Sequence, residues 1–414
     1  MKIETGQGRI SLIALVGIWS ISALNALPGL AVSPILNKVS QIFPEATELD
    51  VQMLSSLPAL LTIPFILLSG FLTQHVNNIK LLRWGLWIFT ISGILYLFSN
   101  KMWQLIAISG MLGAGSGMIV PLSTGLITRF FVGSYRIKQF GYSSAITNIT
   151  LVIATIVTGY LAEINWHLPF LVYLLPIVSI ILSIKLKDTI APGKKLEAST
   201  INITVKDRKI NTKSGLDTKN LIEIMAFYGT VTYLAVLVTL NLTFLTAEYN
   251  ISSGTAGQLI AVFFLAIMLP GLFLNKIITK LKNLTLFSGV VMITAGLFLI
   301  IASKLVLIIG TGCALTGLGY GIIQPSIYNK TTSLATSKKV TMALAFVMAM
   351  NYGAILICPF IISAVSRMFD THSQVFPFIF NGSIALLTTI WAYKRKDSFL
   401  FSQCKEEEEE IVKI

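Results

Sequence analysis

Long apolar runs, each of about twenty residues or more, follow one another along most of this sequence and are separated by short polar connections. The runs are continuous and do not alternate with polar residues, so they predict membrane-crossing helices and not the strands of a membrane barrel. Charged residues make up only 12% of the chain, whereas a soluble protein carries about a quarter. We therefore expect an all-α integral membrane protein without β-strands.

The runs number twelve and divide evenly between the two halves of the chain. We expect spans at 10–33, 51–73, 81–99, 103–128, 139–162, 167–187, 220–246, 254–278, 284–302, 304–328, 340–365 and 373–393. Residues 1–187 then form an N-terminal six-helix bundle and residues 220–394 a C-terminal one. Residues 188–219 form a cytoplasmic linker, because they lack the apolar periodicity that a domain needs, and residues 395–414 form a cytoplasmic acidic tail.

Lysine and arginine are distributed unevenly between the two sides of the membrane that these spans define. Of the 31 basic residues, 27 fall at the N-terminus, the C-terminus and alternate connections. The remaining four are Lys38, Lys101, Lys304 and Arg367. Basic residues concentrate on the cytoplasmic side, so both termini are expected in the cytoplasm of a multi-pass protein of the plasma or inner membrane. This topology accounts for the net charge of +13 without a nucleic-acid partner.

A glycine pattern with a following proline, G-x-G-x-G-x-x-x-P, occurs twice, about half the chain length apart. Matched Gly/Pro-interrupted segments in two halves indicate an internally duplicated transporter. The glycines reduce bulk around the helix, and the proline permits a bend. We expect these residues to take part in gating: Gly113, Gly115, Gly117 and Pro121 in the first half, and Gly317, Gly319, Gly321 and Pro325 in the second.

Twelve spans, a six-plus-six repeat, a basic central connection and cytoplasmic termini resemble the twelve-helix type of the major facilitator superfamily over essentially the whole chain. The family's helix 2–3 connection has an aspartate four residues after a glycine. Here Gly70 is followed by Gln74, and in the second half Gly271 is followed by Asn275. In the family this aspartate helps lock the outward-open state, so the resemblance implies a looser cytoplasmic gate with an amide in its place.

Two motifs of proton-coupled drug antiporters in the family are changed. Ser109 stands where helix 4 of many such exporters has an arginine. The helix 5 antiporter pattern falls on Thr150, Ala154, Thr155, Thr158 and Gly159, and only the last glycine is kept. The fold resemblance is therefore strong, and the resemblance to proton-coupled antiporters is weak.

The resemblance implies a cavity lined by helices 1, 4, 7 and 10, with helices 2, 5, 8 and 11 beside them. Uncharged polar residues in these spans are the candidate substrate-binding residues. The alternative for each is a hydrogen bond between helices. Asn148 and Asn351 occupy nearly corresponding positions and are expected to face each other. The candidates are Asn25, Asn148, Tyr233, Asn241, Gln258, Tyr320, Gln324 and Asn351.

No ionisable residue lies at the middle of any expected span, where a buried charge would mark an ion or proton pathway. The substrate is therefore expected to be neutral, weakly charged or lipophilic. Glu223, about one turn inside the seventh span, is the candidate for proton coupling. The alternative is a membrane-edge carboxylate beside Lys219, four residues earlier.

Nothing in the sequence indicates catalysis: there is no nucleophile with a base, no phosphate loop and no metal-ligand spacing. We expect a secondary transporter that works by alternating access without a cofactor or metal, and we favour efflux. An importer, a facilitator and a non-transporting membrane sensor stay open as alternatives. The expected partners are a small-molecule substrate, the lipid bilayer and, if transport is coupled, protons. No nucleic acid is expected, and the chain is expected to be monomeric.

Overall fold

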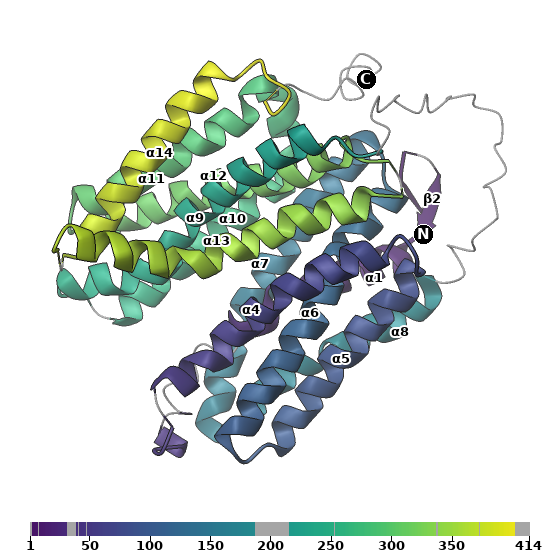
Figure 1. Ribbon diagram of the computed structural model, residues 1–414, viewed down its shortest axis with the longest axis horizontal. Helices are drawn as coiled ribbons and strands as arrows, with labels where there is room; N and C mark the ends of the chain where they lie inside the picture. Colours follow the sequence, from purple (N-terminus) through teal and green to yellow (C-terminus); the bar gives the residue numbers. More distant parts are fainter. Residues whose placement is uncertain are drawn as a thin grey trace.

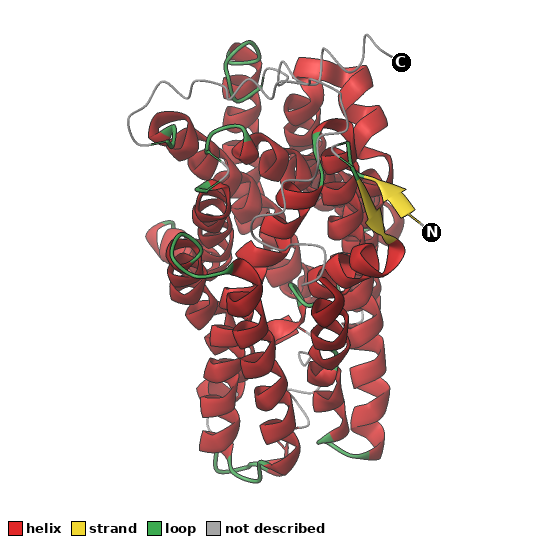
Figure 2. Ribbon diagram, turned by 90° about the vertical axis from the view of Figure 1, so that its right-hand side faces the viewer, coloured by secondary structure: helices red, strands yellow, loops and turns green. Residues whose placement is uncertain are grey.

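The computed structural model describes residues 2–6, 8–30, 39, 41–46, 48–186, 215–251, 253–336, 338–371 and 373–401. The expected linker lies outside this part of the chain up to residue 214, and the expected tail lies outside it from residue 402. The described residues are almost entirely helical, and the helices run between two faces that carry the connections (Figure 2).

Each of the twelve expected spans contains helix. Residues 10 and 11 of the first span belong to a strand, and residues 31–33 and 187 lie outside the described part of the chain. In the first half the helices are α1 (Leu12–Ala23) with α2 (Leu27–Leu30), α4 (Glu48–Leu72), α5 (Asn78–Phe98), α6 (Met102–Phe130), α7 (Gly133–Ile164), and η2 (Leu168–Leu174) with α8 (Pro176–Leu186). In the second half they are α9 (Thr218–Glu248), α10 (Ser253–Leu281) with η4 (Lys282–Leu284), α11 (Thr285–Ala302), α12 (Val306–Thr332), α13 (Val340–Met368) and α14 (Phe376–Lys394).

The first and sixth spans are each divided into two helical pieces. In the first span α1 and α2 are separated by a turn just before Pro28, and in the sixth α8 begins at Pro176. Pro28 and Pro176 each lie in the first turn of the helix that follows the break, where the missing backbone N–H would have had no partner within the helix. Eight helical stretches among the described residues are long and apolar enough to cross a membrane, one of them running through α10 and α11. Shorter apolar helices lie in α1, α4 and the η2–α8 segment.

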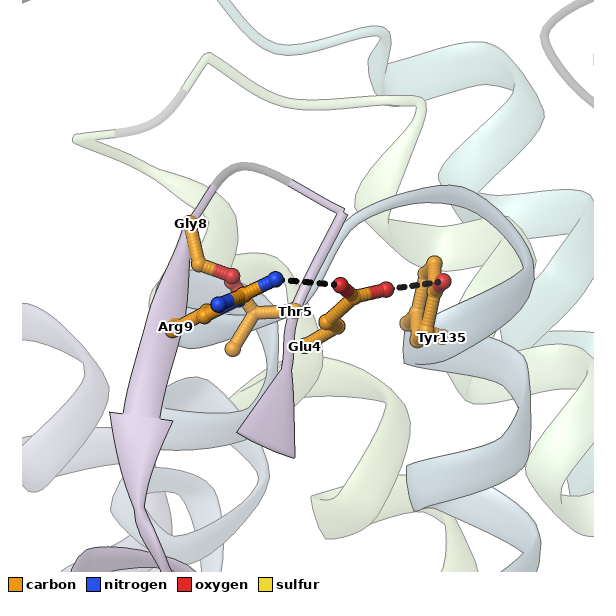
Figure 3. Close-up of polar contacts among 5 residues, drawn as sticks. All are labelled: Glu4, Thr5, Gly8, Arg9 and Tyr135. Atoms are coloured by element: carbon orange, nitrogen blue, oxygen red, sulfur yellow. Dashed lines mark hydrogen bonds and ion pairs between the residues drawn. The ribbon is translucent and has the colours of Figure 1, made fainter. Parts of the chain in front are cut away.

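The expectation of no strands is wrong at the N-terminus. Strands β1 (Lys2–Glu4) and β2 (Arg9–Ser11) form an antiparallel hairpin. The Glu4 carboxylate accepts hydrogen bonds from Arg9 and from the Tyr135 hydroxyl, each at 3.2 Å (Figure 3). The backbone N–H of Val132 donates to the Thr5 carbonyl at 3.0 Å, so the hairpin is fixed to the connection between α6 and α7. Strands of three residues are too short for periodicity to reveal.

The two copies of the glycine pattern pack in the same way in the two halves. The first and third glycines of each copy face one neighbouring helix, and the second faces another. A Cβ atom at any of the six would come within 3.0 Å of a neighbouring helix, which shows how closely the backbones approach. The pairs are α6 with α4 (Gly113, Gly117) and with α5 (Gly115), and α12 with α10 (Gly317, Gly321) and with α11 (Gly319).

The two halves meet at one face and diverge toward the other (Figure 1). The face where they meet is here called the basic face; it carries the N-terminal hairpin and the connections at 73–77, 131–132 and 333–336. There Gly70 of α4 lies against Ala345 of α13, and Gly141 of α7 lies against the Gly271 carbonyl of α10. The opposite face is called the distal face. The structure is therefore closed at the basic face.

The predicted gating residues lie in two different settings. Gly70 and Gly271 contact the other half directly, and the Gln74 amide reaches Met342 Sδ of the other half at 2.8 Å. Asn275 lies one turn beyond Gly271 on α10. The glycines of the repeated pattern instead contact helices of their own half. In this conformation, then, the repeated pattern holds each bundle together, and the helix 2 and helix 8 glycines hold the two bundles against each other.

We predict that Gly141→Leu weakens closure of the basic face, because its side chain would overlap the Gly271 carbonyl. Overpacking of this kind costs about 1–3 kcal/mol, which would shift the population toward opening by roughly 5- to 150-fold. Spin labels on His75→Cys and Lys338→Cys, in a Cys404→Ser background, would report a longer distance. Gly353→Leu on α13 is the matched control, because nothing lies within 4 Å of an added Cβ there. An unchanged distance distribution in Gly141→Leu would show that this contact does not set the gate.

Candidate functional site

Buried hydroxyl and amide groups from three helices of the second half meet in one cluster. It is here called the tyrosine cluster and consists of Tyr228, Thr232, Tyr320, Gln324, Tyr328 and Asn351. The Asn351 amide nitrogen lies 2.8 Å from the Tyr320 hydroxyl, 2.9 Å from that of Thr232 and 3.1 Å from that of Tyr228. The Tyr228 hydroxyl lies 3.2 Å from that of Tyr320 and 3.1 Å from that of Tyr328. It also accepts from the Gln324 amide at 3.2 Å.

Helical spacing brings these side chains together. Tyr228 and Thr232 are four residues apart on α9, and Tyr320, Gln324 and Tyr328 follow one another at intervals of four on α12. Side chains four residues apart lie on the same helix face. Each helix therefore presents a polar stripe toward the other, and Asn351 on α13 closes the third side.

The cluster has more hydrogen-bonding neighbours than it can satisfy at one time. The Asn351 amide has two N–H donors for three hydroxyl oxygens, and the Tyr228 hydroxyl has four polar neighbours within reach. Tyr228 is fully buried, and Tyr320 and Asn351 are 9% and 8% exposed. A ligand group can therefore replace one of these bonds without leaving the other groups unpaired, which is the costly outcome for buried polar groups.

Two hydrogen bonds connect this region to the first half of the chain. The Ser144 hydroxyl on α7 donates to Gln324 Oε1 at 3.2 Å. The Tyr352 hydroxyl, next to Asn351, donates to the Asn25 carbonyl at 3.1 Å, in the break between α1 and α2. The Asn25 side chain in turn donates to the Ser123 hydroxyl on α6 at 3.0 Å. The polar groups thus run across the junction between the two halves.

The structure brings four of the eight predicted substrate-binding residues into this region: Asn25, Tyr320, Gln324 and Asn351. Asn148 donates to the Ser144 carbonyl of its own helix at 2.8 Å and is not hydrogen-bonded to Asn351. Gln258 is exposed on α10. Tyr233 lies on α9, where its backbone carbonyl is 3.9 Å from Cys358 Sγ, and Asn241 lies nearer the distal end of the same helix.

Sequence reasoning missed Tyr228, Thr232, Tyr328, Ser144 and Ser123. Three of the five, Tyr228, Thr232 and Tyr328, lie four residues, or twice four, from another polar residue of the region. A search for polar residues at intervals of four within the apolar spans would have found Tyr228 with Thr232, and Tyr328 with Gln324. Ser144 and Ser123 have no comparable distinguishing signal, because helix hydroxyls commonly bond their own backbone, as Ser123 also does to Val120.

Glu223 lies outside the tyrosine cluster, at the basic-face end of α9. Its carboxylate accepts from Arg395 at the end of α14 at 2.8 Å, and the two side chains are 23% and 52% exposed. The expected partner Lys219 is therefore replaced by Arg395, because the C-terminal end of α14 comes beside the first turns of α9. A partly exposed ion pair of this kind contributes about 0–1 kcal/mol to stability.

The sequence pattern of the Major Facilitator Superfamily matches residues 10–210 and 221–403. The chain belongs to this superfamily. It is therefore a multi-pass membrane protein and a secondary transporter, and not an enzyme. The superfamily fold is also that of the human organic anion transporter MFSD10 (TETRAN), with a TM-score of 0.73 at 12% identity over 92% of this chain and 99% of that one. The proton:xylose symporter XylE gives 0.69 at 14% identity over 92% and 94%.

Two curated proteins are similar in sequence to this chain. The quinolone resistance protein NorA of Staphylococcus aureus (strain MRSA252) is 27% identical over 165 residues, which is 38% of this chain and 41% of NorA. The chain thus matches less than half of NorA's length. The uncharacterized MFS-type transporter YceJ of Bacillus subtilis (strain 168) is 24% identical over 317 residues, which is 75% of this chain and 78% of YceJ.

We predict that Asn351→Leu lowers stability more than Asn148→Leu. The Asn351 amide serves three hydroxyl groups on two other helices, whereas the Asn148 amide bonds only its own helix. Leaving buried hydroxyls unpaired costs about 1–3 kcal/mol. Thermal unfolding of the purified variants in one detergent would measure the difference. Equal loss of unfolding temperature in both variants would contradict a structural role for the cluster.

Proposed function

We propose that this transporter exports a small neutral, weakly charged or lipophilic molecule by alternating access, and that the tyrosine cluster contacts it. The observation that carries the proposal is a buried, uncharged polar cluster joined to the other half of the chain by the Ser144–Gln324 bond. The Tyr352–Asn25 bond makes a second connection beside it. A molecule that takes over such bonds binds the open and closed states unequally, and only unequal binding shifts a conformational equilibrium.

The chemistry of the cluster favours an uncharged substrate with aromatic or apolar surface. All six members are uncharged, and three are tyrosines whose rings offer apolar area beside their hydroxyls. A full charge placed among them would be buried without a partner of opposite sign, at a large desolvation cost. Uncharged donors and acceptors on the substrate would instead be matched by hydroxyl and amide groups.

Two observations bear on the direction of transport. The partial likeness to a protein named for quinolone resistance supports export. Ser109, in place of the antiporter arginine, counts against proton-driven export; its hydroxyl bonds the Ile106 carbonyl of its own helix at 2.7 Å. Uptake or facilitated diffusion is therefore the alternative function.

The distribution of basic residues supports a cytoplasmic basic face, which makes this structure the outward-open state. The expected result is that an impermeant maleimide labels Lys338→Cys only after cells are opened, in a Cys404→Ser background. Lys304→Cys, on the distal face, is the matched control and should be labelled in intact cells. The reverse pattern would overturn the orientation.

We predict that cells expressing this chain accumulate less of a neutral lipophilic fluorescent dye such as Nile red, and that Gln324→Leu restores accumulation. The substitution removes the bonds of Gln324 to both Tyr228 and Ser144. Loss of about 1 kcal/mol of interaction corresponds to roughly fivefold slower efflux. Ser383→Ala is the control, because this exposed hydroxyl bonds only the Ile379 carbonyl of α14. Increased accumulation in cells with the unaltered chain would favour uptake, and efflux unchanged by Gln324→Leu would remove the cluster as the site.

Glu223 is the group we propose for proton coupling, if transport is coupled. In proteoliposomes, Glu223→Gln would then abolish uphill transport driven by a pH gradient while leaving exchange intact. Arg395→Gln distinguishes proton coupling by Glu223 from a structural role of its ion pair, because this substitution removes the ion pair but keeps the carboxylate. Uphill transport that survives in Glu223→Gln would exclude this residue as the proton site.

A further inference from the structure

A cavity lies near the distal ends of α9, α13 and α14, away from the tyrosine cluster. Its volume is about 460 Å³, within the range of roughly 300–1,000 Å³ that is usual for small-molecule sites. Leu240, Phe244 and Ile362 form apolar parts of its wall, and Asn241, Ser363 and Ser366 form polar parts. Nine residues separate Asn241 from Thr232 of the cluster, which is about 13 Å along the helix. The two sites are therefore separate.

Several hydrogen-bonding groups in this cavity have no partner among the residues that the structure describes. Asn241 is only 9% exposed, yet within the described part of the chain its amide makes no hydrogen bond. The same holds there for the hydroxyls of Ser363, Ser366 and Thr371. By contrast, the hydroxyls of Ser383 and Thr388 on α14 bond the carbonyls of their own helix. The Asn241 amide is not among the polar atoms sealed from solvent, so it is accessible from the cavity that Asn241 lines. The wall is therefore suited to a molecule with hydrogen-bonding groups of its own.

The rim of the cavity is held in place by a single carboxylate. Glu248, at the end of α9, accepts from the Ser373 hydroxyl at 3.2 Å and from the Gln374 backbone N–H at 2.5 Å. These bonds tie the end of α9 to the start of α14, and Ser373 and Gln374 both line the cavity. The site is thus formed before a ligand binds, which reduces the ordering cost of binding. Among the described residues that line the cavity none is charged, and the Glu248 carboxylate at its rim already accepts from Ser373 and Gln374.

We propose that this cavity binds an uncharged amphiphile, a molecule with an apolar body and a head of several hydrogen-bonding groups. The body packs on Leu240, Phe244 and Ile362, and the head bonds Asn241, Ser363 and Ser366. Its place at the distal ends of the helices is level with a membrane interface, where amphiphiles concentrate. An anionic head would find no cationic side chain among the described lining residues, and for a cationic head the Glu248 carboxylate at the rim is already engaged by Ser373 and Gln374.

The test uses the purified full-length chain in lipid nanodiscs and an alkyl glucoside with a photoactivatable diazirine in its chain. Peptide mapping should place the photolabel on the distal parts of α9 and α13. Asn241→Leu and Ser363→Leu should each reduce this labelling about tenfold, because each removes a polar group and adds bulk to the cavity. Ser363 is exposed, so its leucine variant tests the proposal even if Asn241→Leu fails to fold.

Two controls separate this cavity from other binding. Ser383→Leu, on the exposed face of α14, and Asn351→Leu, in the tyrosine cluster, should keep full labelling. Loss of labelling in Asn351→Leu would assign the probe to the cluster and overturn the proposal. So would equal labelling in Ser363→Leu and the unaltered chain. Diazirine analogues with a trimethylammonium or sulfate head should label less than the glucoside, and equal labelling by them would overturn the inference of an uncharged ligand.

Discussion

Close approach of helix backbones is the constraint on which this structure depends. Within a lipid bilayer, burying apolar side chains between helices gives little driving force, because lipid tails are equally apolar. Helices must instead gain contact area by approaching closely, and glycine is the residue that allows it. The glycines at 113, 115 and 117 and their counterparts at 317, 319 and 321 bring two neighbours onto each central helix. The same device, at Gly141 and Gly271, joins the two bundles.

The second organising feature is a polar region placed where the closed junction ends. Gly70 and Gly141 contact the other half at the basic face. Farther from that face, the neighbouring contacts are hydrogen bonds of the polar side chains Ser144, Gln324 and Asn351. Small-residue packing is insensitive to a ligand, whereas hydrogen bonds can be exchanged for those of a ligand. The hydrogen bonds that a ligand can replace therefore lie directly beside the glycine contacts that hold the two halves together.

The fold could be predicted from the sequence because each span is a separate signal, long and apolar enough to be read alone. The site was predicted only in part. Asn25, Tyr320, Gln324 and Asn351 stand out as polar residues in apolar spans, and the structure brings them together. Tyr228 was missed because its spacing of four from Thr232 was not used, and because its other partners lie on α12 and α13. Asn241 met the same criterion as Asn351, but on α9 it lies nine residues beyond Thr232 of the cluster, and the sequence alone does not show which of the two asparagines joins the cluster.

The N-terminal hairpin and the ion pair between Glu223 and Arg395 could not be predicted from the sequence either. Each depends on how a chain end returns to a helix bundle, and the contacts of Glu4 with Tyr135 and of Glu223 with Arg395 join residues far apart in the chain. Neither contact has a local pattern that would predict it.

The backbone contact between Gly141 and Gly271 has a consequence for the heat and entropy of switching. Closing a junction with long side chains freezes their rotamers, at about 1–2 kcal/mol for the most flexible side chains. Two glycines have no rotamers to lose, so this part of the junction closes without that entropic cost. Because it also buries little apolar side-chain area, its closure should carry only a small heat-capacity change. The contribution of this contact to the equilibrium between the open and closed states would then vary little over a wide range of growth temperatures.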